Sequence, residues 1–323
     1  MKHITIFTAA MAIGLCASAT DTYTNPVIPK SLPDPTVMRA ADGTFYLFAT
    51  ENTRNVPIYR SANLVDWTFA GTAFTDATRP QWNPKGAIWA PDINETGGKY
   101  LLYYSKSEWG GEWTCGIGVA TADAPQGPYI DRGPLFISNE IGVQNCIDPF
   151  YIEDNGHKYI FWGSFHGIYG SELTDDGLAL RSDAGLVKIA GDFMEATYIH
   201  RHDGYYYLFG SAGRCCEGER STYRVTVGRS ENLLGPYTDR QGRPLTDNHH
   251  EVILSRSESV IGPGHNSEII TDAEGNDWIL YHGFSADSPD KGRLVFLDRV
   301  SWVDGWPVIA GGTPSENSPR PRF

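Results

Sequence analysis

Five stretches of the chain share one pattern of polar and apolar positions. Apolar runs of this length, bounded by turn residues, predict β-strands. No long stretch has apolar residues at a 3.6-residue period, so we expect few helices. Each stretch is a glycine-bearing turn followed by an aromatic and aliphatic run: "DGTFYLFAT" (42–50), "GGKYLLYYS" (97–105), "NGHKYIFWGS" (155–164), "DGYYYLFGS" (203–211) and "GNDWILYHG" (275–283).

Each predicted strand has neighbours of the same plan. A short apolar run lies before each turn, and several units continue into a third strand such as "VTVGRSENLLGPY". The unit recurs every ~45 to 70 residues, the length expected of a four-stranded propeller blade. We therefore predict an all-β fold, a five-bladed β-propeller.

Acidic residues introduce four of the five opening runs. They are Asp34, Asp92, Asp148 and Glu195, and the fifth run carries "GPGH", which ends at His265. The innermost strand of each blade lines the axis of a propeller, so these distant residues are predicted to converge at one end of the axis. A single Asp-Pro pair is usually a plain turn. For Asp92 we expect only a capping or hydrogen-bonding role at the strand end.

Composition and charge narrow the class further. The chain has 35 Gly, 20 Pro and 12% aromatic residues, which suits short strands and tight turns. Its formal net charge of -13 disfavours nucleic acid or an anionic membrane as the partner, because both repel an acidic surface. A neutral glycan remains open as a partner, and we expect a monomer without stable membrane insertion.

The first 19 residues resemble a secretory signal. Lys2 precedes a short apolar stretch, and Ala17 and Ala19 form an A-x-A pattern. We expect cleavage after Ala19 and a secreted or periplasmic protein, with residues 20–323 forming a single catalytic propeller domain. Lipoprotein anchoring through Cys16 is the alternative, which Leu15 disfavours because a small residue is expected before the cysteine.

Four further cysteines follow the signal. Cys115, Cys146, Cys215 and Cys216 do not have the spacing of a zinc site. Adjacent cysteines rarely bond to each other because the resulting ring is strained. We expect all four to be buried free thiols.

Three carboxylates around one pocket suit glycoside hydrolysis. This reaction needs one protonated acid for the leaving oxygen and one ionised carboxylate. A third acid nearby can keep the first protonated, because like charges raise each other's pKa. Aromatic residues such as Trp89, Trp109 and Trp113 can stack on sugars, although burial in the core is the commoner role of any one aromatic residue.

A set of motifs resembles the arabinanases of glycoside hydrolase family 43. The set includes "LPDPT", "IWAPDI", "NCIDPF", "WGSFHGI", "MEATYI", "CCEGERSTYRVTVGRS" and "GPGHNS", in order from about residue 25 to "GWP" at 305–307. The resemblance implies an inverting hydrolase on a five-bladed propeller. Its substrate would be the α-1,5-linked L-arabinofuranose chain of arabinan or arabino-oligosaccharides, with endo cleavage preferred.

The resemblance also implies roles for single residues. Asp34 resembles the general base, Glu195 the general acid, and Asp148 the residue that raises the pKa of Glu195 and orients it. His265 resembles the family's axial metal position, where calcium would be held mostly through water.

Three positions depart from the usual family pattern. This chain has Pro33 where the family often has His, Cys146 where it often has Ala, and His166 where it often has Trp. The exact subsite pattern is therefore open. The substrate contacts that the resemblance implies are Trp89, Asn145, Ser164, Phe165 and His166.

Other functions remain open at this point. One is an exo-acting family 43 enzyme on arabinan or arabinoxylan, an arabinofuranosidase or xylosidase. Another is a secreted glycan-binding propeller without catalysis. Sucrose- and fructan-cleaving enzymes share the propeller, but their "NDPNG" and "RDP" motifs do not occur here. Loops 76–86 and 108–114 are expected to decide between an open groove and a closed pocket, and so between endo and exo cleavage.

Overall fold

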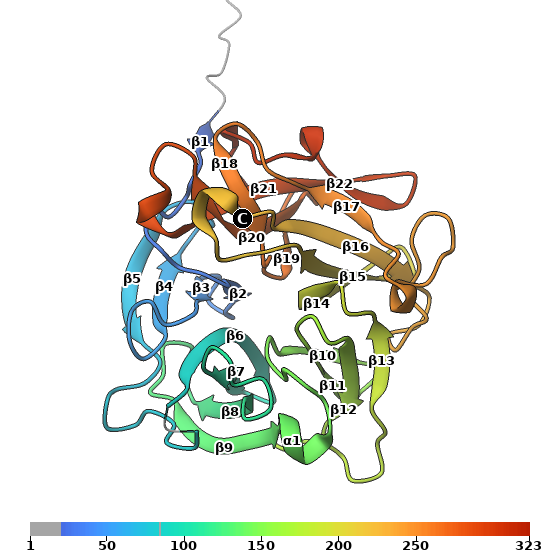
Figure 1. The fold of residues 1–323 in the computed structure, drawn as a ribbon. Helices are drawn as coiled ribbons and strands as arrows, with labels where there is room; N and C mark the ends of the chain where they lie inside the picture. The colour runs from blue at the N-terminus through green and yellow to red at the C-terminus, as the bar shows by residue number, and fades with distance from the viewer. Residues whose placement is uncertain (1–20, 84) are drawn as a thin grey trace, which may run out of the picture.

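Five antiparallel sheets form a ring around a central axis (Figure 1). The structure is a computed structural model that describes residues 21–83 and 85–323. Each sheet is built from strands that follow one another in the sequence, as expected for a propeller blade. The prediction of a five-bladed β-propeller is confirmed.

The blades follow one another along the chain. Blade one comprises β2 (Thr36–Arg39), β3 (Phe45–Phe48), β4 (Pro57–Ser61) and β5 (Trp67–Thr72). Blade two comprises β6 (Ala87–Thr96), β7 (Lys99–Ser107), β8 (Gly116–Ala122) and β9 (Ile130–Ile137). Blade three comprises β10 (Phe150–Asp154), β11 (His157–Trp162), β12 (Ile168–Glu172) and β13 (Val187–Ala190). Blade four comprises β14 (Met194–His202), β15 (Tyr205–Ala212), β16 (Arg224–Ser230) and β17 (Glu251–Leu254). Blade five comprises β18 (Val260–Gly264), β19 (Ile269–Thr271), β20 (Asp277–Ser285), β21 (Arg293–Val303) and β22 (Trp306–Ile309).

The five repeated sequence stretches form equivalent strands. They are β3, β7, β11, β15 and β20, each of which pairs with the innermost strand of its own blade. Helices are few, as predicted. The described residues contain α1 (Ser138–Ile141) and the 3-10 helices η1 (Gly218–Arg220), η2 (Leu245–Asp247), η3 (Pro289–Lys291) and η4 (Ala310–Gly312).

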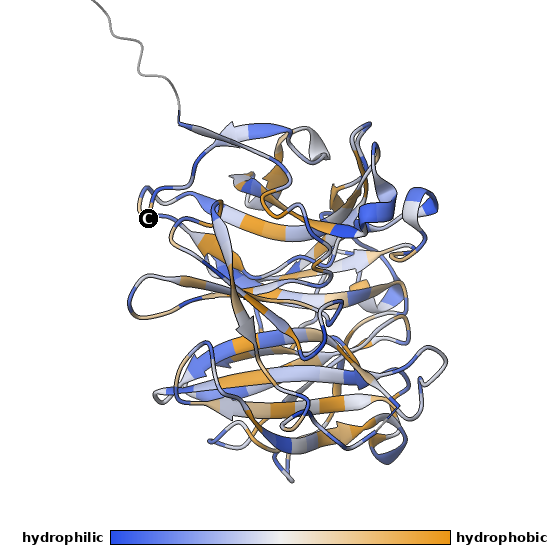
Figure 2. Cartoon of the chain, turned by 90° about the vertical axis from the view of Figure 1, so that its left-hand side faces the viewer, coloured by the Kyte–Doolittle hydropathy of each residue, from blue (hydrophilic) through white to orange (hydrophobic). Residues whose placement is uncertain are grey.

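Apolar side chains fill the spaces between neighbouring blades. Phe136 of blade two packs on Trp162 of blade three with ring centroids 4.6 Å apart, and Phe150 of blade three packs on Tyr198 of blade four at 4.9 Å. Figure 2 shows the apolar residues concentrated along the strands. Burial of these large rings stabilises the packing of neighbouring blades through the hydrophobic effect.

The N-terminal segment closes the ring against blade five. Strand β1 (Thr22–Thr24) pairs with β23 (Asn317–Pro319) near the C-terminus. Ile28 then exchanges backbone hydrogen bonds with Val295 of β21, and the hydroxyl of Tyr23 donates to the carbonyl of Leu297 at 2.6 Å. The two ends of the chain therefore join the first and last blades.

One residue near the start of each blade has a positive φ angle. Because a side chain larger than glycine rarely adopts this conformation, each of these kinks must be held by its surroundings. The residues are Asp34 (φ 56°), Ala90 (φ 37°), Asp148 (φ 57°), Ala196 (φ 60°) and His265 (φ 46°).

The backbone N–H of each kinked residue donates a hydrogen bond to the preceding blade of the ring. The acceptor lies at or near the end of the repeated aromatic strand in four blades, and it is the carboxylate of Asp148 in blade three. The five bonds are Ala90 N to Thr50 Oγ1 (2.7 Å), Asp148 N to Ser105 Oγ (2.9 Å), Ala196 N to Asp148 Oδ2 (3.2 Å), His265 N to Ser211 Oγ (2.8 Å) and Asp34 N to His282 Nδ1 (3.1 Å). We call these five bonds the amide ring.

The predicted signal peptide and Cys16 lie outside the described residues. Within residues 21–83 and 85–323, no helix is long and apolar enough to cross a membrane.

The amide ring predicts a difference between two buried serines. Ser105→Ala removes the acceptor of the Asp148 N–H and should lower the free energy of unfolding by about 1–3 kcal/mol, because a buried donor loses its partner. Ser171 is also buried, but its hydroxyl has no partner, so Ser171→Ala removes an unpaired polar group and should not lower stability. Urea unfolding measures both values. Equal losses for the two variants would contradict a structural role for the amide ring.

Candidate active site

A pocket of about 380 Å³ lies at one end of the propeller axis. It brings together all nine residues that the sequence predicted for the site. They are Asp34, Trp89, Asn145, Asp148, Ser164, Phe165, His166, Glu195 and His265. Their convergence is confirmed, whereas their individual roles stay predictions.

The acids of the repeat do not occupy equivalent positions. Asp34 and Asp148 are themselves the kinked residues of their blades, whereas Glu195 precedes the kink at Ala196. Asp92 follows the kink of blade two by two residues and does not line the pocket. It is buried, and its carboxylate accepts the Tyr151 N–H at 2.7 Å. Asp92 therefore has the hydrogen-bonding role that we expected for it.

Positive charge surrounds the carboxylate of Asp34. Arg293 Nη1 donates to Asp34 Oδ1 at 2.9 Å, and His265 Nδ1 lies 3.1 Å from the same oxygen. The hydroxyl of Thr50 donates to Oδ2 at 2.6 Å. Burial would raise the pKa of Asp34, but Arg293 and His265 outweigh it and hold the pKa well below its ordinary value. Asp34 is therefore an ionised carboxylate at neutral pH.

His282 contributes to this cluster without a charge. Its Nδ1 accepts the backbone N–H of Asp34, and burial lowers the pKa of the ring to about 3. The ring is therefore neutral. Its main role here is to hold the backbone of Asp34.

The carboxyl group of Glu195 faces a different environment. Ser164 donates to Oε2 at 2.6 Å and Tyr223 donates to Oε1 at 2.7 Å. These bonds favour the ionised form, but burial outweighs them and raises the pKa of Glu195. The group can therefore hold a proton at a pH where an ordinary glutamate has lost it.

Asp148 forms an interacting pair with Glu195. Its Oδ2 accepts the N–H of Ala196, the residue next to Glu195. Burial raises the pKa of Asp148 to about 8; His265 opposes the rise, and the charges of Glu195 and Asp34 add to it. Because the two acids interact, their protons belong to the pair rather than to either residue. The pair can therefore retain one proton at neutral pH.

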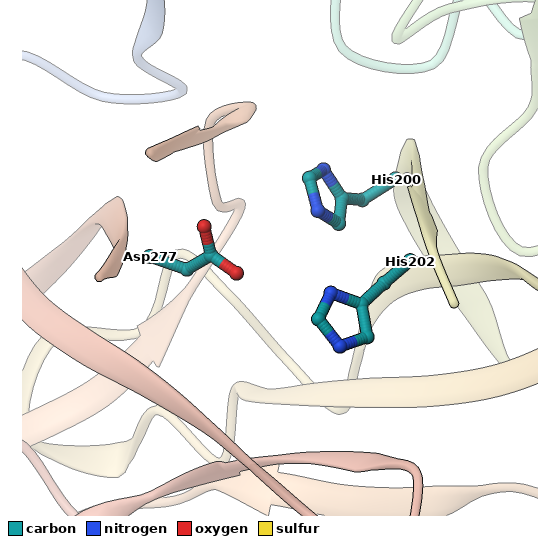
Figure 3. A group of neighbouring side chains, drawn as sticks. All are labelled: His200, His202 and Asp277. Atoms are coloured by element: carbon teal, nitrogen blue, oxygen red, sulfur yellow. The ribbon is translucent and has the colours of Figure 1, made fainter. Parts of the chain in front are cut away.

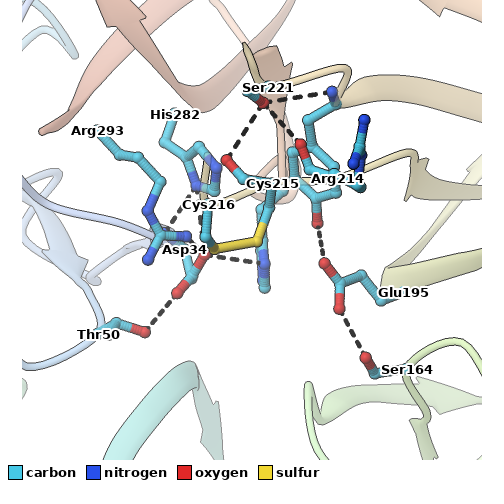
Figure 4. The surroundings of a disulfide bond; sticks show 12 residues. Asp34, Thr50, Ser164, Glu195, Arg214, Cys215, Cys216, Ser221, His282 and Arg293 are labelled. Carbon is cyan, nitrogen blue, oxygen red and sulfur yellow. Dashed lines mark hydrogen bonds and ion pairs between the residues drawn. A yellow bond between two sulfur atoms is a disulfide. The ribbon is translucent and has the colours of Figure 1, made fainter. Parts of the chain in front are cut away.

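Asp34 and Glu195 lie on opposite sides of the pocket (Figure 4). One environment favours the carboxylate and the other favours the carboxylic acid. Two acids whose pKa values are shifted in opposite directions can work as a base and an acid on the same substrate.

Aromatic and polar side chains form the pocket wall. The rings of Trp89 and Trp109 lie 5.5 Å apart, and Trp109 is 81% exposed. His166 Nε2 lies 3.6 Å from a carboxylate oxygen of Glu112. Loop 108–114 therefore borders the pocket, as predicted. None of the described residues of loop 76–86 lines this pocket, so its part in shaping a groove stays a prediction.

A disulfide between Cys215 and Cys216 forms another part of the wall (Figure 4). The prediction of free thiols is wrong for this pair. It rested on the strain of the ring that two adjacent cysteines close, because the Cα atoms of ordinary disulfides lie about 4.4–6.8 Å apart. Here the Cα atoms are 3.8 Å apart within the loop after β15, which directs both sulfur atoms to one side. Cys115 and Cys146 are buried free thiols, as predicted.

His265 can offer only a partial site for calcium. The ion takes six to eight oxygen ligands, whereas His265 offers one nitrogen. Its Nδ1 already faces Asp34, so Nε2 is the remaining ligand atom. Burial lowers the pKa of His265, but Asp34 more than compensates and raises it, so a proton competes with a metal for Nε2. A calcium ion here would depend mostly on water.

Sequence reasoning missed several residues of the site. Arg293 and Tyr223 lie in stretches without a repeated acid. Arg293 of blade five contacts Asp34 at the start of blade one, and Tyr223, next to β16, contacts Glu195 within blade four. Thr50 and His282 could have been found, because they lie at or near the ends of two of the five repeated strands. The equivalent Ser105 and Ser211 also accept amide protons of the next blade.

The propeller and its opposed acids define a carboxylate-dependent glycoside hydrolase. The sequence model of the glycosyl hydrolases family 43 matches residues 23–307. The chain therefore belongs to glycoside hydrolase family 43.

Known proteins of this family resemble the chain over most of its length. The extracellular exo-α-(1→5)-L-arabinofuranosidase ArbA of Cellvibrio japonicus is 32% identical, over 85% of this chain and 85% of that protein. The extracellular endo-α-(1→5)-L-arabinanase 1 of Bacillus subtilis is 30% identical, over 85% and 87%. The structure of a Cellvibrio cellulosa α-L-arabinanase complexed with arabinohexaose superposes with a TM-score of 0.79 at 31% identity, covering 86% of this chain and 95% of that chain.

The buried acid pair predicts a dependence of stability on pH. An unfolded aspartate loses its proton near pH ~3.9, whereas the pKa of Asp148 in the folded protein is about 8. Between these values the folded state binds more protons, so its stability falls as pH rises. Asp148→Asn should therefore gain stability relative to the unchanged protein as pH rises, with a gain at about pH 8 that exceeds the gain at about pH 5 by on the order of 4 kcal/mol.

Urea unfolding at the two pH values measures this difference. Asn at position 148 keeps an oxygen that can accept the Ala196 N–H, so the amide ring is preserved. Asp175→Asn, at an exposed aspartate, is the control and should show no such difference. A stability gain that is independent of pH would contradict a raised pKa at Asp148.

Proposed function

We propose that the protein is an inverting, endo-acting α-1,5-L-arabinanase. The observation that carries this proposal is the opposition of Asp34, held ionised by Arg293, to Glu195, whose pKa is raised by burial. The relatives named as arabinanases support arabinan and arabino-oligosaccharides as substrates. The extracellular names of two relatives support secretion.

Asp34 is the general base of the proposed mechanism. Its carboxylate takes a proton from water as the water oxygen attacks the anomeric carbon. Arg293 and His265 keep this carboxylate ionised before the attack. Because His282 and Thr50 bind the backbone and side chain of Asp34, the carboxylate keeps one orientation.

Glu195 is the general acid. It donates its proton to the oxygen that leaves with the rest of the arabinan chain. The resulting carboxylate is stabilised by the hydroxyls of Ser164 and Tyr223, which already point at it. Asp148 shares one proton with Glu195 before the reaction, and it holds the Ala196 amide so that Glu195 keeps its place.

The pocket wall binds the sugar chain in this proposal. Trp89 offers a face for a furanose ring, and Asn145, Phe165 and His166 border the same space. Exo cleavage is the second candidate, because one relative of similar identity is named an exo-acting arabinofuranosidase. Trp109, which is exposed at the rim, lies where a loop could limit the length of bound chain.

Calcium enters the proposal only as an ion held mostly by water beside His265. When bound, it would add positive charge near Asp34. The proton transfers above depend on Asp34 and Glu195 alone.

Hydrolysis of linear arabinan by Glu195→Gln tests the proposal. The unchanged enzyme should release a ladder of oligosaccharides; a single small product would instead favour the exo candidate. The variant should lose this activity by about 10²–10⁴-fold, because the amide cannot donate a proton. It should retain cleavage of an aryl arabino-oligoside, whose leaving group needs no protonation.

Glu268→Gln is the matched control for this variant. Glu268 is a partly buried acid outside the pocket lining, and burial raises its pKa to about 7. The control should keep most of the arabinan activity. Full activity of Glu195→Gln on arabinan, or equal losses in both variants, would contradict the role of Glu195.

A further inference from the structure

Two histidines and an aspartate converge outside the active site. His200 and His202 alternate on β14, so both side chains project from the same face of the strand. Asp277 is the first residue of β20 in the next blade. One ligand atom from each residue lies within 4.8 Å of the others. Figure 3 shows both imidazole rings extending from β14 toward the carboxylate of Asp277.

This cluster lies far from the pocket. Strand β14 carries Glu195 near its first residue and His202 at its last, a separation of seven residues or roughly 23 Å along the strand. Strand β20 likewise carries His282 near the pocket and Asp277 at its other end. The cluster and the pocket are therefore at opposite ends of the same two strands.

Neighbouring side chains hold Asp277 and the rings in place. Thr271 donates to Asp277 Oδ1 at 2.6 Å, and Trp302 Nε1 donates to Oδ2 at 2.7 Å. The indole of Trp302 also stacks on His202, with ring centroids 3.7 Å apart. His202 Nε2 lies 3.4 Å from Asp203 Oδ2. Supporting contacts of this kind orient the ligands in metal sites.

The ligand set suits a particular group of cations. Two imidazoles and one carboxylate favour late first-row divalent ions, above all Zn²⁺, over calcium or magnesium. Both imidazoles act as ligands in their neutral form. A tetrahedral zinc ion needs its ligand atoms roughly 3.4 Å apart, so small side-chain rotations would complete the site.

We propose that His200, His202 and Asp277 bind a zinc-class divalent cation at the end of the propeller opposite the pocket. Water completes the coordination. The ion connects the innermost strand of blade four to β20 of blade five. Its effect is on the stability of the closed ring and not on the chemistry of the pocket.

Titration of the chelator-treated protein with Zn²⁺ tests the proposal. At a zinc concentration about 100 times the dissociation constant, Tm should rise by roughly 4 °C. Co²⁺ used in place of Zn²⁺ should give visible absorption bands at one equivalent. Hydrolysis of arabinan should change little, because the ion does not reach the pocket.

Single variants identify the ligands. His202→Gln, at a partly exposed position, should weaken Zn²⁺ binding at least tenfold and remove the cobalt bands, and His200→Gln should do the same. His157→Gln, at an exposed histidine of blade three, is the control and should bind like the unchanged protein. Zinc affinity that survives both ligand variants, or an unchanged protein with neither a Tm shift nor cobalt bands, would overturn the proposal.

Discussion

The backbone amide of one kinked residue in each blade is bound by the blade before it, and the site depends on this constraint. A kink at a residue other than glycine is unfavourable by itself, so the five amide bonds must hold it. The kink turns Asp34, Asp148 and His265 into the pocket and leaves Glu195 one residue earlier beside them. The contacts that connect the blades therefore also position the functional groups.

Charge is divided unevenly across this pocket. Arg293 and His265 stabilise an anion at Asp34, whereas burial favours a proton shared by Asp148 and Glu195. Burying the pair of Asp148 and Glu195 destabilises the fold at neutral and alkaline pH, and the amide ring together with the inter-blade cores offsets this loss. Because Asp148 belongs to both the ring and the acid pair, fold and chemistry are coupled at this residue.

The repeat in the sequence was sufficient to predict the propeller, because each blade repeats one strand pattern. The convergence of nine site residues also followed from that repeat and from the family motifs. Other features depend on tertiary contacts that no local pattern encodes. Arg293 reaches Asp34 from the far end of the chain, and the Cys215–Cys216 bond depends on the path of one loop. The position of each acid relative to the kinked residue of its blade could not be predicted either. Asp92 therefore has the sequence motif but does not line the pocket.

In the proposed mechanism, Asp34 and Glu195 act from opposite sides of the sugar, with water between Asp34 and the anomeric carbon. Such an arrangement gives a single displacement, with carboxyl groups roughly 6.5–9.5 Å apart, and inverts the anomeric configuration. Proton NMR of the first sugar released from an arabino-oligosaccharide, recorded before mutarotation, measures this outcome directly. A single displacement predicts that the α-linkage yields the β-anomer first. Initial release of the α-anomer would show retention and contradict the assignment of Asp34 as a base acting through water.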